Sequence, residues 1–265
     1  MNKRSFRRAL AGIWWLTLLF LYLPLAVVAL FSFNAANSAA SFTGFSLRWY
    51  QRLLGNEEIL SAFANSMILA IVSSVVALAI GCLIGYGMYR HRHRKLGWLI
   101  VLIYLPIVLP DIVFGISEMA FFVQIHRLTG FLQPGLPTMI IAHVTFQIPF
   151  VALIVYSRFV GLDPALFEAA KDLYASPVKR AVHFMLPTIK PALISAFFLS
   201  FTLSVDDFVI SFFTAGPESA TLPIYIWGAI KKGVSPEINA VATLMLGAVA
   251  IAAIASLLFS RRRPA

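Results

Sequence analysis

Residues 61–89 read SAFANSMILAIVSSVVALAIGCLIGYGMY and contain no lysine, arginine, aspartate or glutamate. An α-helix needs about 20 apolar residues to cross the hydrocarbon core of a bilayer, and this stretch is longer than that. We therefore predict that it forms a membrane-spanning helix. Within it, Gly81 and Gly85 are four residues apart, a spacing that lets two membrane helices approach closely.

Other apolar runs of similar length follow along the chain. The six predicted spans lie near 10–32, 61–89, 98–125, 137–158, 191–213 and 238–260. Hydrophobic residues make up 60% of the 265 residues, against roughly 45–50% in soluble domains. We predict an all-α membrane protein with one transmembrane domain over residues 1–265. The first run follows a basic N-terminus, and the two together resemble a secretory signal peptide. The run is longer than the apolar region of such a peptide, so we expect it to be a retained helix.

The lysines and arginines are distributed unevenly among the connecting segments. If the N-terminus is inside, 16 of the 21 lie on the cytoplasmic side and five on the outer side. This bias predicts that both termini are cytoplasmic. The net charge of +10 comes from these clusters, so we do not expect nucleic acid binding.

Redox, metal and nucleotide chemistry are not indicated by the sequence. Cys82 is the only cysteine, and it lies in an apolar run. His91 and His93 alternate with arginines, which would repel a metal cation. Because the chain also lacks a phosphate-binding loop motif, we expect no cofactor, metal or ATP site in it.

The longest polar connection, residues 159–190, is predicted to contain two short helices. Asp163 and Pro164 form a strong helix start, because an N-cap acceptor precedes a proline at the first helical position. Residues 175–177 then interrupt the helix. Its small-residue apolar face consists of Leu166, Ala169, Ala170 and Leu173. Such a helix either docks into a groove on a partner protein or lies on the membrane interface.

Two adjacent carboxylates lie in the fifth predicted span, in SFTLSVDDFVISFF at 200–213. In a continuous helix, one polar stripe about 80° wide would contain Ser200, Ser204, Asp207, Ser211 and Thr214. Asp206 would point roughly 100° away from Asp207. We predict that Asp207 faces a pathway through the membrane. Asp206 then lies at the edge of that pathway or holds a neighbouring helix.

The third predicted span carries two more acids, Asp111 and Glu118, on nearly the same helical face. Pro106 and Pro110 interrupt this helix, which membranes tolerate beside a cavity or a partner helix. A carboxylate at the bilayer centre costs about 3 kcal/mol even on the lenient insertion scale, and no lysine or arginine lies in the interior of the spans to compensate. A cationic substrate in a hydrated pathway fits this imbalance, although Glu118 near the surface would simply be solvated.

Aromatic side chains are candidates for the walls of such a pathway, since they cover methylene groups and offer cation–π contacts. The candidates are Tyr86, Tyr104, Phe122, Tyr225 and Trp227. The alternative is that each of them is an ordinary lipid-facing or interfacial aromatic.

Several segments resemble permease subunits of bacterial ABC importers. Glu168-Ala169-Ala170, followed by Leu186-Pro187, is similar to the EAA loop of that family. The segments that resemble its spermidine/putrescine branch are LPDIV (109–113), HVTFQIPF (143–150), EAAKDL (168–173), SFTLSVDDFVISFF (200–213) and GVSPEINAVATL (233–244). Tyr174 departs from the family pattern, because the EAA motif has a glycine there that permits a left-handed turn.

The resemblance implies a type I ABC importer permease fold in the bacterial cytoplasmic (inner) membrane. It implies that the chain is a transport subunit, without enzymatic activity, for a polyamine. The implied partners are a second permease subunit, two copies of an ATP-binding subunit and an external solute-binding protein. The residues implied to couple the chain to the ATP-binding subunit are Glu168, Ala169, Ala170, Leu173, Tyr174, Leu186 and Pro187.

Other functions remain open on the sequence alone. An ABC permease for another small solute would use Asp206 and Asp207 for helix packing instead of selectivity. A cation-coupled secondary carrier would use the acids as proton or sodium sites, but it has no need of the loop at 159–190. A membrane enzyme is disfavoured, because no nucleophile–base pair occurs in the sequence.

Overall fold

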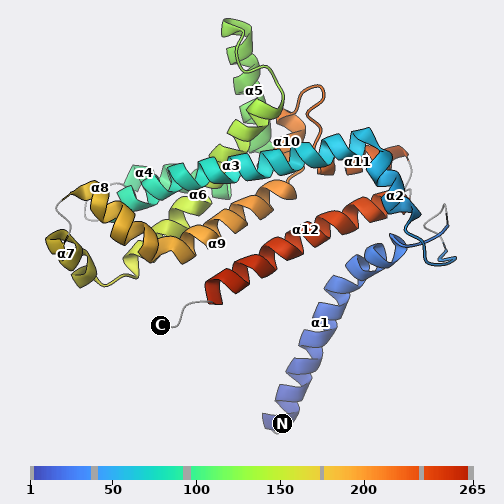
Figure 1. The fold of residues 1–265 in the computed structure, drawn as a ribbon, viewed down its shortest axis with the longest axis horizontal. Helices are drawn as coiled ribbons and strands as arrows, with labels where there is room; N and C mark the ends of the chain where they lie inside the picture. Colours follow the sequence, from blue (N-terminus) through green and yellow to red (C-terminus); the bar gives the residue numbers. More distant parts are fainter. Residues whose placement is uncertain (1–2, 37–40, 92–96, 174–175, 233–235, 262–265) are drawn as a thin grey trace. The chain divides into compact units, whose positions relative to one another are not determined.

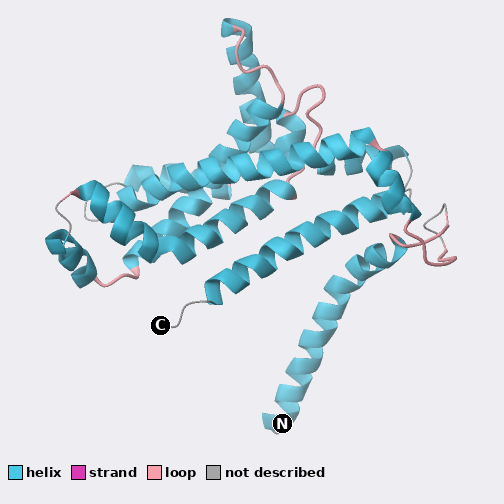
Figure 2. Ribbon diagram, viewed as in Figure 1, coloured by secondary structure: helices cyan, strands magenta, loops and turns pink. Residues whose placement is uncertain are grey.

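The computed structural model describes residues 3–36, 41–91, 97–173, 176–232 and 236–261. Helices dominate these residues (Figures 1 and 2), and the only β-structure in them is an isolated bridge between Asn34 and Phe45. The prediction of an all-α protein is confirmed.

Helices form in all six segments predicted to span the membrane. Four of these segments hold one helix each: α1 (Lys3–Phe31), α3 (Glu57–Arg90), α6 (Leu136–Val160) and α12 (Pro236–Arg261). The third holds α4 (Gly97–Val108) and α5 (Asp111–Thr129), and the fifth holds α9 (Leu186–Val205) and α10 (Val209–Thr214). The remaining helices are α2 (Arg48–Gly55), α7 (Pro164–Leu173), α8 (Pro177–Arg180), a π-helical turn η1 (Ala181–Met185) and α11 (Leu222–Lys232).

Length and apolar composition qualify some of these helices as complete membrane spans. Among the described residues, four helices meet both conditions, or five if α4 and α5 together count as one span. The apolar part of α12, Pro236–Ile251, is shorter. The six-span count and the cytoplasmic position of both termini therefore stay predictions.

The third span is not the single straight helix expected over 98–125. Its two helices are bent by 108° at a break after Val108. Pro110 has no N–H to continue the first helix, and its carbonyl instead accepts the N–H groups of Val113 and Phe114 at 2.9 and 3.2 Å. The interruption predicted from the prolines is confirmed, and it turns α5 away from α4.

The fifth span is also broken, so the prediction of a continuous helix over 191–213 is wrong. α9 ends at Val205, and α10 begins only at Val209. The polar stripe predicted along one helix therefore belongs to two helices. The physical reason lies in the contacts of Asp207, described below.

The chain divides into two compact units, residues 1–60 with 225–248 and residues 61–224 with 249–265. In the first unit, Trp49 is buried and donates its indole N–H to the Asn34 carbonyl at 2.7 Å. The guanidinium carbons of Arg48 and Arg52 lie 4.4 and 5.0 Å from the centre of its ring. These contacts fold the polar segment after α1 onto α2.

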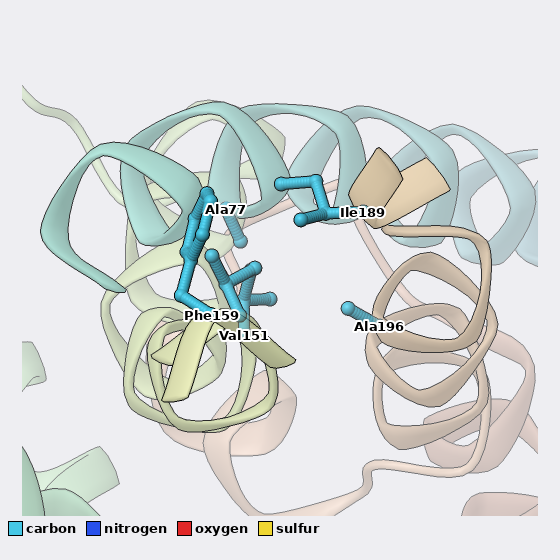
Figure 3. Close-up of a cluster of buried hydrophobic side chains, with 6 residues drawn as sticks. Ala77, Val151, Phe159, Ile189 and Ala196 are labelled. Atoms are coloured by element: carbon cyan, nitrogen blue, oxygen red, sulfur yellow. The ribbon is translucent and has the colours of Figure 1, made fainter. Parts of the chain in front are cut away.

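In the second unit, α3, α6 and α9 lie side by side (Figure 1). Their facing side chains form a buried apolar core, drawn in Figure 3. It consists of Ala77, Val151, Val155, Phe159, Ile189 and Ala196.

Glycines bring α3 and α6 into close contact. A Cβ atom at Gly81 would lie 2.6 Å from the Val151 Cβ, and one at Gly85 would lie 2.6 Å from the Ala152 carbonyl oxygen. Neither position has room for a side chain. The close approach predicted from the glycine spacing is confirmed.

We expect Gly85→Ala to destabilise the protein, because overpacking costs about 1–3 kcal/mol. Gly87→Ala is the matched control: a Cβ atom there would meet nothing within 4 Å, and alanine is the better helix former. Thermal unfolding of the purified protein in detergent should show a lower midpoint for Gly85→Ala and an unchanged or higher one for Gly87→Ala. Equal midpoints would contradict the packing.

Candidate functional site

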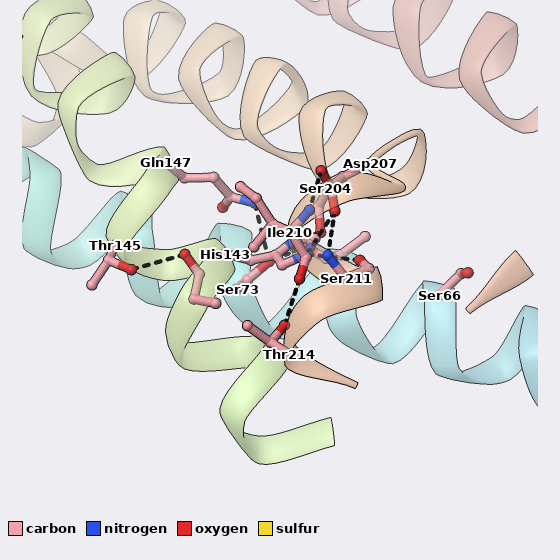
Figure 4. Close-up of polar contacts among 12 residues, drawn as sticks. Ser66, Ser73, His143, Thr145, Gln147, Ser204, Asp207, Ile210, Ser211 and Thr214 are labelled. Carbon is pink, nitrogen blue, oxygen red and sulfur yellow. Dashed lines mark hydrogen bonds and ion pairs between the residues drawn. The ribbon is translucent and has the colours of Figure 1, made fainter. Parts of the chain in front are cut away.

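A buried polar cluster surrounds the break between α9 and α10 (Figure 4). At its centre, the His143 side chain on α6 is 1% exposed. The His143 Nδ1 atom lies 2.7 Å from the Ser204 hydroxyl. The Nε2 atom lies 3.0 Å from the Ser211 hydroxyl and 3.3 Å from the Asp207 carboxylate. One imidazole ring therefore contacts the end of α9, the break and the start of α10.

Asp207 explains why the helix is interrupted. Its carboxylate oxygens accept the backbone N–H groups of Ile210 and Ser211 at 3.2 and 2.8 Å. The first N–H groups of a helix have no partner within that helix, and a short acidic side chain just before it can supply one. Asp207 thus stabilises a new helix start instead of continuing α9.

Hydrogen bonds continue the cluster to α3. The Gln147 amide lies 3.2 Å from the Ser73 hydroxyl, which lies 3.4 Å from the Ser204 hydroxyl. A carboxylate only accepts, so Nε2 of His143 carries the proton that faces Asp207. In a neutral ring Nδ1 then accepts from Ser204. The Ser73 hydroxyl, which accepts from Gln147, also donates to the Ala70 carbonyl at 3.5 Å.

Sequence reasoning missed His143 and Gln147. The signal was available, because these polar residues lie four apart within the predicted span 137–158 and so share one helical face. The predicted residues Ser204, Asp207 and Ser211 do come together, but through a helix break and not along a helical stripe.

Asp206 has different surroundings from its neighbour. It is exposed, at the C-terminal cap of α9, and its backbone N–H donates to the Thr202 carbonyl at 3.3 Å. Among the described residues its carboxylate has no cationic partner. Asp207 is thus held by neighbouring groups, whereas Asp206 is available to solvent or a ligand.

The two acids of α5 also differ. Asp111 is exposed at the first residue of the helix. Glu118 is half-buried and accepts a hydrogen bond from the Thr145 hydroxyl on α6. Its second oxygen, Oε2, is buried without a hydrogen-bond partner in the described part of the chain. An unpartnered buried carboxylate oxygen is costly unless a ligand or water meets it.

The aromatic candidates are spread over the two units. Phe122 is 2% exposed and packs in a core with Ala142 and Ile210, whereas Tyr104 is exposed. In the first unit, Trp227 is half-exposed and lies 5.2 Å from the Lys231 ammonium. Tyr225 lies in the same unit. Its burial and the nearby Glu237 and Glu58 carboxylates raise the pKa of its phenol, which therefore stays protonated.

The predicted cytoplasmic helix forms as α7. Asp163 accepts the Ala165 N–H at 2.9 Å, which confirms the predicted helix start. Ala170 is buried, whereas Glu168, Ala169 and Leu173 are exposed. The expected apolar face therefore divides into an inward residue and an outward surface. Leu186 and Pro187 are exposed at the start of α9, and Tyr174 lies outside the described residues.

An aromatic cluster attaches α7 to the core. The Phe167 ring centre lies 5.3 Å from that of Tyr89 and 6.2 Å from that of Phe159. It also lies 5.9 Å from the ring centre of Phe184 in an edge-to-face arrangement. Tyr86 packs on Phe159 at 5.4 Å, so it belongs to this cluster. These ring contacts attach α7 to α3, α6 and η1.

Residues 77–262 match the family described as binding-protein-dependent transport system inner membrane component. The chain belongs to this family. Members are inner-membrane permease components of ABC importers, which confirms the predicted family and membrane location.

Curated relatives cover most of the chain. It is 38% identical over 242 residues to the spermidine/putrescine transport system permease protein PotC of Escherichia coli K12, which spans 91% of this chain and 90% of that protein. It is 39% identical over 234 residues to the putrescine transport system permease protein PotI of the same strain. That alignment covers 88% of this chain and 83% of PotI.

Solved structures confirm the fold. A chain of a bacterial ABC transporter involved in the import of the acidic polysaccharide alginate aligns over 98% of this chain and 96% of its own length, with a TM-score of 0.70 at 17% identity. A chain of the MetNI methionine ABC transporter aligns over 78% of this chain and 98% of its own length, with a TM-score of 0.64 at 17% identity. The fold is that of type I ABC importer permeases.

We expect His143→Phe to destabilise the protein by about 2 kcal/mol, since three contacts are lost at about 0.6 kcal/mol each and a buried carboxylate loses its partner. His126→Phe serves as the control, because His126 is half-buried near the end of α5 and its ring forms a hydrogen bond with the Phe131 carbonyl and not with the cluster. Unfolding midpoints in detergent measure the difference. A wild-type midpoint for His143→Phe would show that the cluster contributes nothing.

We expect Phe167→Ala to loosen α7 without unfolding the core, because Phe167 carries the ring contacts that join them. Substrate-stimulated ATP hydrolysis by the complete transporter should fall severalfold while complex assembly is retained. Leu173→Ala, a change of a 77% exposed side chain on the same helix, tests the outward surface separately. Full stimulation with Phe167→Ala would show that the aromatic cluster has no part in coupling.

Proposed function

We propose that this chain is a membrane-spanning permease subunit of an ATP-driven importer for polyamines such as putrescine and spermidine. The observation that carries the proposal is the 38% and 39% identity, over about nine tenths of the chain, to permeases named for these substrates. One such chain would form half of the translocation pathway.

The charges inside the predicted spans support a cationic cargo. Arg158, at the end of its span, is the one lysine or arginine within the predicted spans, so Asp111, Glu118 and Asp206 are not neutralised by basic residues deeper in the membrane. The ammonium groups of a polyamine donate hydrogen bonds and accept none, so they complement acceptor-only carboxylates. The unpartnered oxygen of Glu118 offers such an acceptor.

The two adjacent aspartates have separate roles in this proposal. Asp206, exposed at the end of α9, attracts the cation together with Glu118 and Asp111. Asp207 positions the pathway by capping α10 and holding His143. This proposal reverses the roles predicted from a continuous helix. Asp206 is now the residue that contacts the substrate, and Asp207 has the structural role.

The partners follow from the same proposal. The exposed residues Glu168, Ala169 and Leu173 of α7, with Leu186 and Pro187, dock into an ATP-binding subunit present in two copies. A second permease subunit completes the pathway, and an external binding protein delivers the polyamine. ATP binds and is hydrolysed in the partner subunit, so this chain itself needs no cofactor.

A permease for another solute is the second candidate. It is favoured by one observation, that Asp207 within a predicted span has a structural role and so does not by itself indicate a cationic cargo. Uptake of labelled putrescine and spermidine separates the two. Cells expressing the complete transporter, and no other polyamine system, should lose uptake when this chain is omitted.

We expect Asp206→Asn and Glu118→Gln each to reduce polyamine uptake roughly tenfold with normal assembly, which corresponds to about 1.4 kcal/mol of lost interaction. Asp207→Asn should instead reduce the amount of assembled complex, because one cap acceptor and the contact with His143 weaken. Glu57→Gln, at an exposed acid outside the predicted spans, is the control. Normal uptake by both Asp206→Asn and Glu118→Gln would refute the cation pathway.

A further inference from the structure

A cavity of about 430 Å³ lies where the C-terminal part of α3 meets α6 and the α8–α9 run. Its inner wall is apolar and includes Phe159 and Ile189, both 1% exposed. Its outer edge includes Leu83, which is 72% exposed. The cavity therefore extends from the buried core to the surface of a predicted membrane span.

Basic side chains line one end of this cavity. Arg90, the last residue of α3, and Arg180, the last residue of α8, both contribute to its wall. An adjoining hollow of about 220 Å³ shares these two arginines and adds Lys171 of α7. Among the described residues, no carboxylate forms an ion pair with any of the three. The local charge is thus positive and uncompensated within that part of the chain.

Charge and apolar surface are arranged in the order of a bilayer. Arg90 lies at the end of an apolar helix, and Leu83 lies seven residues earlier, roughly 10 Å along the helix axis. Headgroups and acyl chains of a phospholipid follow each other in the same order. Basic pockets between membrane helices on the cytoplasmic side are known to bind anionic lipid headgroups.

We propose that this cavity binds an anionic phospholipid of the surrounding membrane. Its phosphate lies between Arg90 and Arg180, and part of one acyl chain lies against Phe159, Ile189 and Leu83. The charge complementarity and the opening towards the lipid favour this occupant over a protein segment. The site does not depend on which solute the transporter carries.

The position of the site connects it to coupling. The hollow beside the arginines is also lined by Phe167, Ala170 and Lys171 of α7. A bound headgroup therefore contacts the helix whose outward surface is proposed to meet the ATP-binding subunit. Bound lipid should hold α7 against α3, so the lipid acts as a structural part of the coupling helix.

The test uses the complete transporter in nanodiscs that contain equal amounts of phosphatidylcholine and phosphatidylglycerol. Lipids that stay bound after transfer into detergent are counted by native mass spectrometry. We expect phosphatidylglycerol to be retained over phosphatidylcholine by roughly thirtyfold, as expected for two basic contacts near the surface. The double variant Arg90→Gln/Arg180→Gln should lose this preference.

Lys179→Gln is the matched control, since Lys179 is an exposed neighbour of Arg180 on α8 outside the cavity wall. Retention by this variant, with loss by the double variant, supports the site. Thermal unfolding of each complex identifies a variant that has simply misfolded, and Arg180→Gln alone then replaces the double variant.

Three outcomes would overturn the proposal. The first is equal retention of both lipids by the wild-type complex. The second is displacement of the lipid by inorganic phosphate, which would show a headgroup site without acyl recognition. The third is retention that appears only when the ATP-binding subunit is removed, because the cavity would then be covered by that partner.

Discussion

A helix broken inside a membrane needs new partners for its backbone, and this requirement shapes the second unit. Between Val205 and Val209 the α-helix is interrupted, so the N–H groups at the start of α10 need acceptors other than the α9 carbonyls. The Asp207 carboxylate accepts the N–H groups at the start of α10. That carboxylate in turn needs a donor, which His143 supplies from α6. The positions of α6, α9 and α10 are thereby made interdependent.

The same arrangement gives the acids different surroundings. Asp207 is held by the backbone N–H groups of α10 and by His143. Asp206 is exposed, and Glu118 keeps a buried oxygen without a partner in the described chain. α5 approaches α10 closely because Gly115 has no side chain, and a Cβ atom there would lie only 3.2 Å from the Phe213 ring. Packing thus brings the acid-bearing α5 beside the break.

At the other end of this unit, aromatic packing takes the place of polar contacts. Phe167 inserts among Tyr89, Phe159 and Phe184, so α7 presents a stable outward surface. Beside this cluster Arg90 and Arg180, which have no ion-pair partner among the described residues, face an apolar cavity. The aromatic attachment and the positively charged edge of the cavity therefore meet at the helix proposed to contact the ATP-binding subunit.

Hydropathy was enough to establish an all-helical membrane protein, because apolar run length is set by bilayer thickness. Local chemistry also sufficed for the start of α7 at Asp163-Pro164, the interruption at Pro110 and the close packing at Gly81 and Gly85, since each depends on neighbouring residues or short spacing. The break at Asp206 did not follow from local sequence, because its stability depends on His143, more than sixty residues away. Periodicity assumes an unbroken helix, so the different surroundings of the two aspartates emerged only from tertiary contacts.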